Sequence, residues 1–220
     1  MVEEPAAALV DVGGGVVDVD AVRDFLTARA GATVVRDRVY ALDITTSGTA
    51  AVTSACGKAE YDALVLASGA NTSPLAAQVG IYTAPMLAHH VRFTFRIEGD
   101  RWQSWIDKPP GGVGTYQHQA GPGLWAVGGH VDPSMTAWEV GRDAAIAASR
   151  IALLDYARTR LTVDPTIVES VYCTTVPNLG DGVEFRRNGP VLAVYGDNLM
   201  KLAPALGAAV VGAVMDGSTP

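Results

Sequence analysis

The chain has 220 residues, of which 49% are hydrophobic and 18% charged, a composition typical of a globular protein with a substantial core and not of a disordered chain. Its formal net charge of −7 argues against nucleic-acid binding, which needs a stripe of Lys and Arg to neutralise phosphates. The first residues form no basic leader before an apolar stretch, and the most apolar run, residues 202–214, is short for a membrane span. We therefore expect a cytoplasmic protein with neither nucleic acid nor membrane as a partner.

Cysteine and histidine spacing gives no sign of a metal site or a disulfide framework. Cys56 and Cys173 are far apart and have no CxxC or Cys/His spacing. The adjacent His89 and His90 would point to opposite faces of a strand, which disfavours a shared metal ion. We predict no metal.

The first third of the chain has the pattern of an α/β fold. A helix is predicted to begin at Asp18 or Asp20, either of which can act as N-cap, and to end near Gly31, with Val22, Phe25 and Leu26 on one face. Strands are predicted at 33–35, 39–44, 50–54 and 58–61. Residues 63–67 form a continuous apolar run, typical of a strand buried on both faces, and a Ser-Gly-Ala-Asn turn ends it.

From about residue 86 the pattern becomes that of an antiparallel sheet. Half-buried strands are predicted at 90–97, 101–106, 112–118 and 124–130, joined by turns rich in Pro and Gly. A long helix at 136–161 and a strand at 167–176 follow. The last unit is a strand at 190–195, a polar turn and a helix at 202–215. These elements predict an α/β (α+β) chain, with α/β pieces at both ends and an antiparallel sheet between them.

Four local strings resemble one enzyme family. They read GGGVVDVD at 13–20, GATVV at 31–35, YDALVLASGA at 61–70 and KLAPALG at 201–207. Their order and spacing are similar to the G-G-x-x-D-x-D, G-A-x-V, A-D-x-V-V-L-A-A-G-A and K-F-A-P-A-I-G segments of the D-amino-acid oxidase and sarcosine oxidase family of FAD enzymes. The resemblance covers nearly the whole chain. It implies an incomplete FAD-binding Rossmann-like domain in residues 1–80, an inserted antiparallel-sheet substrate domain with a long helix in 81–182, and a return to the FAD-binding-like domain in 183–220.

The resemblance also implies site residues. It places FAD against the residues Val39, Gly69, Ala70, Cys173, Gly196, Asn198 and Lys201, with Val39 near the adenine and Cys173 at a position of thioether attachment. It implies a substrate pocket for a small amine or amino acid lined by Tyr116, His118, Trp125 and His130, and catalytic roles for Lys201, Tyr116 and His130. Purely structural roles for Cys173, Lys201, the two histidines and Trp125 stay open.

The chain departs from the family at three points. The 220 residues contain no G-x-G-x-x-G loop, and Asp18 occupies the third glycine position of the nearest imitation. Trp125 stands where the family has an oxygen-activating lysine. Asp197 places a negative charge in the turn expected beneath the flavin, where reduced flavin accumulates electrons.

Two hypotheses follow from the resemblance and its departures. The first is an FAD-dependent oxidoreductase module that oxidises the C–N bond of a small amino acid or secondary amine. It needs an N-terminal half, which either a partner chain supplies or the given sequence omits. The alternative is a degenerate, flavin-free homologue that acts as a partner subunit, or in binding or non-redox chemistry. In both, the edge of the strand at 63–67 exposes unpaired N–H and C=O groups, so we expect a protein partner or a second copy to cover it.

Overall fold

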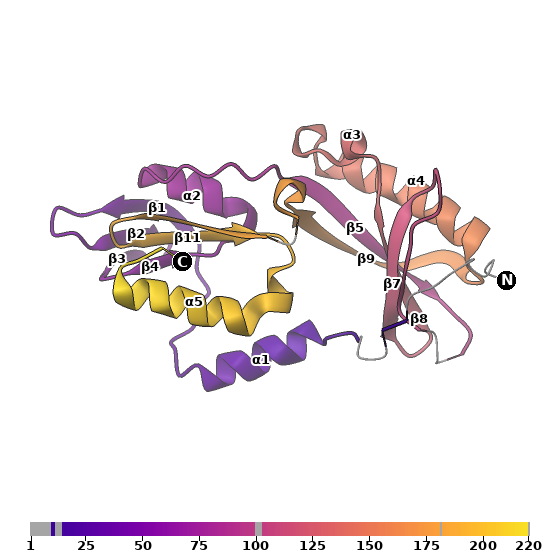
Figure 1. The fold of residues 1–220 in the computed structure, drawn as a ribbon, viewed down its shortest axis with the longest axis horizontal. Coiled ribbons are helices and arrows are strands. Elements are labelled where there is room, and N and C mark those ends of the chain that lie inside the picture. Colours follow the sequence, from indigo (N-terminus) through magenta and orange to yellow (C-terminus); the bar gives the residue numbers. More distant parts are fainter. Residues whose placement is uncertain (1–9, 12–14, 100–102, 181, 220) are drawn as a thin grey trace. The chain divides into compact units, whose positions relative to one another are not determined.

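The computed structural model describes residues 10–11, 15–99, 103–180 and 182–219, which form two compact units (Figure 1). One unit comprises the residues up to Thr33 together with Ala88–Cys173, and the other comprises Val34–Leu87 together with the residues from Thr174 onward. We call the first of these two units the sheet unit and the second the pocket unit. The domain ranges predicted from the sequence, 1–80, 81–182 and 183–220, have other boundaries than these two units.

The sheet unit is built on five strands. They lie in the order β6 (Trp105–Asp107), β7 (Gly114–Gly121), β8 (Leu124–His130), β5 (Ala88–Arg96) and β9 (Asp164–Thr175). The pairs β6–β7, β7–β8 and β8–β5 are antiparallel. Loops containing Gly111, Gly112 and Gly123 join them, as the turn residues predict.

Helix α4 (Arg142–Arg160) covers one face of this sheet (Figure 1). Alternate residues of β5 and β8, including Phe93 and Trp125, pack with Leu153 of α4 in a buried core. The predicted helix at 136–161 is wrong at its start, because the segment forms a short helix α3 (Pro133–Thr136), a 3₁₀ turn (Trp138–Val140) and then α4. Gly141 lies between the 3₁₀ turn and α4, and its φ of 84° is a conformation that cannot continue a helix.

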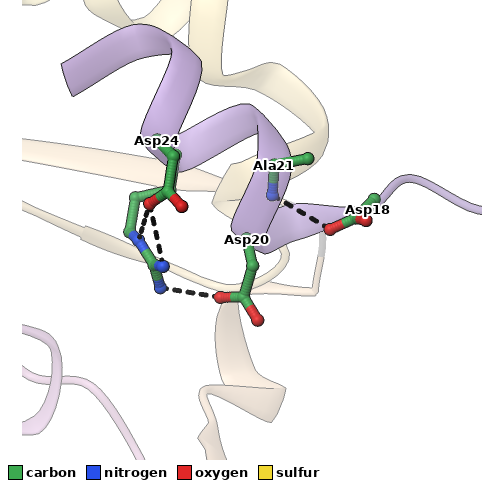
Figure 2. A network of polar contacts seen from close by, with 5 residues as sticks. Asp18, Asp20, Ala21 and Asp24 are labelled. Carbon is green, nitrogen blue, oxygen red and sulfur yellow. Dashed lines mark hydrogen bonds and ion pairs between the residues drawn. The ribbon is translucent and has the colours of Figure 1, made fainter. Parts of the chain in front are cut away.

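Helix α1 (Val19–Arg29) begins as predicted, and Asp18 is its N-cap. The Asp18 carboxylate accepts from the Ala21 backbone N–H at 3.0 Å, and Arg23 bridges Asp20 and Asp24 at 2.7 and 3.0 Å (Figure 2). Within the described part of the chain no α1 residue is buried, so its predicted apolar face is exposed. The predicted strand at 33–35 is wrong: no partner strand pairs with these residues in the described chain, and they have no strand geometry.

The pocket unit contains two three-stranded sheets. One has the order β1 (Val39–Ile44), β2 (Ala50–Ser54), β3 (Gly57–Tyr61) and is antiparallel. The other has the order β10 (Val183–Asn188), β11 (Val191–Gly196), β4 (Leu64–Leu66), in which β11 and β4 are parallel. Helices α2 (Thr72–Gln78) and α5 (Ala203–Asp216) complete the unit.

Strand β11 is the centre of the pocket unit. Val191 and Ala193 pack into a core with α2 and the β1–β2 pair, whereas Leu192 and Val194 pack against α5. The strand that is buried on both faces is therefore β11. The prediction that residues 63–67 form such a strand is wrong, because β4 covers only part of that range and Val65 is 36% exposed. Strand β10 and helix α2 were not predicted.

Residues Leu199–Asp216, comprising a 3₁₀ turn (Leu199–Leu202) and α5, are long and apolar enough to cross a membrane by length and composition. The run is longer than the 202–214 stretch considered in the sequence. One face of α5, with Leu206, Val210 and Val214 partly buried, packs against β11, whereas Ala213 is the one residue of α5 that is fully buried and Val211 and Met215 are exposed.

Candidate functional site

A pocket of about 260 Å³ lies within the pocket unit, where the ends of β4 and β11 meet the start of α2. Its walls include Gly69 and Ala70 after β4, and Gly196, Asp197 and Asn198 after β11. These two parallel strands point their carboxyl ends to the same edge, so turns about 130 residues apart in sequence form one site. Four of the residues predicted to contact FAD thus line a single pocket: Gly69, Ala70, Gly196 and Asn198.

The glycines of this pocket are required by the backbone. Gly69 has φ of 57°, which an L-residue adopts at a cost, although a Cβ there would meet open space. Gly196 is required by packing, because a Cβ would collide with the carbonyl oxygen of Gly182. Asn198 also has a left-handed φ, 53°, and precedes the 3₁₀ turn that leads into α5.

Asp197 brings a negative charge to the pocket wall, and backbone donors offset part of it. One carboxylate oxygen accepts from the Asn198 N–H at 2.8 Å and the other from the Val176 N–H at 3.4 Å. Hydrogen bonds to an ionised carboxylate disperse its charge. The pocket is therefore lined by small residues at the strand ends, by larger side chains that include Leu87, Tyr195 and Leu199, and by one tethered carboxylate.

A second cluster lies on the face of the five-stranded sheet opposite α4, which we call the open face. His90 and Arg92 of β5 and Tyr116 and His118 of β7 lie on it. The β8 residues between them are small: Gly128 is in register with both Arg92 and Tyr116. Side chains from β5 and β7 therefore meet above β8.

Two hydrogen bonds cross β8 on the open face. His90 Nε2 lies 3.0 Å from Tyr116 Oη, and Arg92 Nη1 lies 3.2 Å from His118 Nε2. His118 Nδ1 lies 2.9 Å from the Gln119 carbonyl oxygen. Because a carbonyl only accepts, Nδ1 carries the proton, and Nε2 is the acceptor that faces Arg92. Burial raises the pKa of Tyr116, while the positive charge of Arg92 lowers it.

The remaining predicted site residues lie apart from these clusters or at their edges. His130 is exposed on the open face, with its ring 6.3 Å from that of His90. Cys173 of β9 is exposed and forms no disulfide, and a thiolate there would raise the pKa of Tyr116. Trp125 faces α4 instead, is 1% exposed, and donates Nε1–H to Gln117 at 2.9 Å. Within the pocket unit, Val39 is the first residue of β1 and Lys201 is exposed in the 3₁₀ turn, and neither lines the pocket.

Comparison with solved structures identifies the fold. NikD, an unusual amino acid oxidase essential for nikkomycin biosynthesis, superimposes with a TM-score of 0.71 at 19% identity, over 90% of this chain and 56% of that one. Iminodiacetate oxidase from Chelativorans (TM-score 0.66, 15% identity, 90% and 54% covered) and glycine oxidase from Geobacillus kaustophilus (0.65, 16%, 91% and 54%) are also similar.

The chain has the fold of the FAD-dependent amino-acid oxidases. This amino-acid-oxidase fold is shown by structure alone, since no protein-family model and no curated protein sequence matches the chain. The 220 residues span about half the length of the oxidases they match, 54–56%. In coarse terms, the sequence-based prediction of a mixed α/β flavoenzyme fold is confirmed.

Sequence reasoning missed Arg92, which holds His118 on the open face. The signal for its position was present, because the alternation of residues 90–97 places Arg92 on the face opposite Phe93 and Phe95. The contact of Arg92 with His118 of β7 could not be predicted from the residue pattern of a single strand. Gly128 was also missed, although a glycine inside a strand often marks close approach of another group.

Proposed function

We propose that this chain contributes the flavin-ring pocket and the substrate-facing sheet of an FAD-dependent oxidoreductase acting on the C–N bond of a small amino acid or secondary amine. The observation that carries the proposal is the pocket that gathers Gly69, Ala70, Gly196 and Asn198 from two distant segments. Its fit to a flavin ring rests on a mixed lining, in which Gly69, Ala70 and Gly196 let a flat group approach the backbone closely and apolar side chains such as Leu87 contact the ring. The amino-acid-oxidase fold supports the same conclusion.

The chain's own residues would divide the work as follows. FAD, when bound, supplies the acceptor for the two electrons removed from the C–N bond. Gly69, Ala70, Gly196 and Asn198 would hold it, with Lys201 in the 3₁₀ turn before α5 and Val39 toward the adenine. On the sheet unit, Tyr116 and His130 would bind the substrate and handle its proton, beside His118. The raised pKa of Tyr116 keeps its phenol protonated at neutral pH, so it acts as a hydrogen-bond donor.

We further propose that tight FAD binding needs a phosphate-binding segment outside these residues, supplied by a partner chain. A dinucleotide is gripped at its pyrophosphate by a glycine loop and helix N-terminus, which this sequence does not contain. Strand β4 is an edge of its sheet within the described chain and pairs only with β11, so a further polypeptide or a second copy can extend the sheet there. Light scattering from the purified chain would test this. A monodisperse monomer, or nanomolar FAD binding by that monomer, would contradict it.

A flavin-free role is the second candidate, and two observations favour it. Trp125, at the position of the family's lysine, packs under α4 instead of presenting a cation. Asp197 adds negative charge to the pocket wall. In this role the chain would bind a partner or a ligand without redox chemistry.

Melting curves of the purified chain with FAD and with ADP separate the two candidates. A ligand that binds only the folded state raises the melting temperature by mass action. If the pocket binds the flavin ring, FAD stabilises the chain in a saturable way and ADP, which lacks the ring, does so much less. Because these residues lack the phosphate-binding segment, the curves are recorded up to about millimolar ligand, where even a Kd in that range stabilises the chain. At those concentrations, equal effects of FAD and ADP, or no effect of either, would rule out the flavin pocket and leave the flavin-free role.

Covalent attachment at Cys173 is a separate part of the proposal. The thiol is exposed on β9 and in the same unit as Tyr116. If FAD is attached there, flavin colour remains with the polypeptide after denaturation and gel filtration, and Cys173→Ser releases it while Cys56→Ser does not. Colour lost from the denatured wild-type chain would show that binding is non-covalent.

A further inference from the structure

The pocket at the ends of β4 and β11 has a negatively charged lining. Among the residues that the structure describes, Asp197 is the one acidic side chain in this lining, and no lysine, arginine or histidine accompanies it there. No ion pair joins Asp197 to a basic side chain within the described residues. Lys201, the next basic residue along the chain, is exposed in the 3₁₀ turn and lies outside the lining.

The other titratable group in the lining, Tyr195, adds no charge. Burial raises the pKa of its phenol, the hydrogen bond with Glu184 raises it further, and Arg186 lowers it, with a net rise. The phenol donates to Glu184 Oε2 at 2.7 Å, and Glu184 is paired with Arg186 at 2.9 Å. Tyr195 is therefore uncharged at neutral pH, and the charge on the pocket wall is that of Asp197.

The backbone disperses the charge of Asp197 without cancelling it. The two N–H groups that bind its carboxylate belong to Asn198 and Val176, which also line the pocket. Because the carboxylate uses these donors, they are not available to an anionic ligand. The positive end of the helical segment that begins at Leu199 is worth about half a unit charge, less than one carboxylate. An anion in the pocket therefore meets net repulsion, and an uncharged group does not.

We propose that Asp197 sets the charge selectivity of this pocket, so that the oxidised flavin ring binds more tightly than the reduced ring. The oxidised ring is uncharged, whereas uptake of two electrons and one proton gives a reduced ring with one negative charge. Repulsion between two unit charges across a pocket of this size weakens binding of the reduced ring about three- to thirtyfold.

This inference rests on the proposed function and deepens it, because it states how the pocket tunes the flavin. A site that binds the oxidised form more tightly lowers the reduction potential of the bound ring, and a nearby charge is one of the means by which proteins do so. A tenfold difference in binding corresponds to about 30 mV for a two-electron couple. Flavin held in this pocket is therefore a weaker oxidant than free flavin.

The test is a titration of the chain with FMN in mildly alkaline buffer of constant ionic strength, with the FMN either oxidised or reduced anaerobically with dithionite. The phosphate of FMN has the same charge in both forms, so the ratio of the two dissociation constants reports on the ring. Backbone ¹H–¹⁵N NMR signals of Gly69 and Gly196 locate binding in the pocket. We expect the dissociation constant of reduced FMN to be about three- to thirtyfold larger. Equal constants, or tighter binding of reduced FMN, would overturn the proposal.

Two variants separate the charge of Asp197 from its structural contacts. Asp197→Asn removes the charge and keeps a side-chain carbonyl that can accept from the Asn198 N–H, so the ratio should fall close to one. Asp43→Asn removes an exposed carboxylate of β1 outside the lining and should keep the wild-type ratio. A purely structural role for Asp197 would weaken both forms equally and leave the ratio unchanged in Asp197→Asn, which would contradict the proposal.

A measurement on the wild-type chain covers the case in which Asp197→Asn does not fold. In mildly acidic buffer the reduced ring takes up a second proton and becomes neutral, so its weaker binding should disappear. A ratio that stays the same in acid would show that the pocket discriminates by shape, and it would overturn the proposal.

Failure of this inference and failure of the proposed function are distinguishable. Oxidised FMN that shifts no signal of the pocket up to about millimolar concentration would overturn both. Oxidised and reduced FMN that shift the pocket signals with equal affinity would leave the flavin pocket and remove only its charge selectivity.

Discussion

The phenol ring of Tyr116 lies directly over Gly128 of the neighbouring strand β8, and a Cβ at Gly128 would collide with the ring and its hydroxyl. The next residue, Gly129, faces α4, where a Cβ would come within 2.5 Å of Leu153 Cδ2. Consecutive glycines thus serve opposite faces of one strand. One permits the layer of polar side chains on the open face, and the other permits close packing of the helix.

We predict that Gly128→Ala displaces Tyr116 or destabilises the fold by about 1–3 kcal/mol through overpacking. Urea unfolding measures the cost. Gly114→Ala is the matched control, since its Cβ would make only ordinary contacts at 3.8–4.0 Å. In a Tyr116→Ala background the cost of Gly128→Ala should largely disappear. A cost that is unchanged in that background would show that the strain lies elsewhere.

The buried network beneath α4 predicts a second stability effect. Tyr156 donates its hydroxyl to Asp107 Oδ2 at 2.7 Å and accepts from Gln117 Nε2 at 2.7 Å, and Trp125 donates to the same Gln117. Tyr156→Phe leaves Asp107 and Gln117 short of a partner, so the free energy of unfolding should fall by about 1–3 kcal/mol.

Chemical denaturation of Tyr156→Phe beside Tyr82→Phe measures this effect. Tyr82 is 82% exposed, so its loss of a hydroxyl should change stability by less than about 0.5 kcal/mol. Burial raises the pKa of Tyr156 to about 12, with Asp107 also raising it and the hydrogen bonds with Thr115 and Gln117 lowering it, so its phenol should ionise well above pH 10 in an alkaline absorbance titration. A Tyr156 phenol that ionises near its ordinary pKa of 10 would contradict the network.

The lowered pKa of Asp37 predicts that the pocket unit loses stability in acid. The Ser54 hydroxyl and the backbone N–H groups of Arg38 and Cys56 lower the pKa of Asp37 from 3.8 to about 2. A carboxylate with a depressed folded-state pKa contributes stability above its ordinary pKa and loses that contribution as pH falls toward the folded value. The wild-type chain should therefore lose stability between about pH 4 and pH 2 through this group.

Urea midpoints of Asp37→Asn measured from pH 6 to pH 2 test this dependence. The variant should be less stable than wild type near pH 6, and the difference should shrink toward pH 2. Asp43→Asn, which removes an exposed carboxylate from β1, controls for the loss of one negative charge. A gap between wild type and Asp37→Asn that stays constant with pH would contradict the assignment.

The sequence predicted the elements whose signals are local. Strands at 39–44, 50–54 and 124–130 match β1, β2 and β8 residue for residue, because alternating apolar residues are bounded by glycine and polar turns. Strand β10 was missed since Glu184, Arg186 and Arg187 mask its alternation, and it is held by β11 and a 2.7 Å bond from Tyr195 to Glu184. Helix α2 has only seven residues and includes Pro74, so its periodicity is too short to detect.

Burial was harder to predict than strand position. Residues 63–67 and 191–195 are both apolar runs, and only tertiary packing decides that the second is the central strand and the first an edge. For the candidate sites, the resemblance gave the residues of the pocket, whereas the Arg92–His118 contact joins strands 26 residues apart and depends on Gly128 being small. To predict such a contact, one must know the register of β5, β8 and β7 relative to one another.

The central claim is that the pocket between the ends of β4 and β11 receives the flavin ring. Titration of FAD fluorescence with the purified chain, with Ala70→Trp and with Ala77→Trp tests it most directly, because Ala70 lines the pocket and Ala77 is exposed on α2. We predict saturable quenching of equal strength for wild type and Ala77→Trp, and its loss in Ala70→Trp, whose indole fills the pocket. Because binding without the phosphate-binding segment is weak, the titration extends to about millimolar protein, and equal quenching by all three proteins, or by none, over that range would contradict the account.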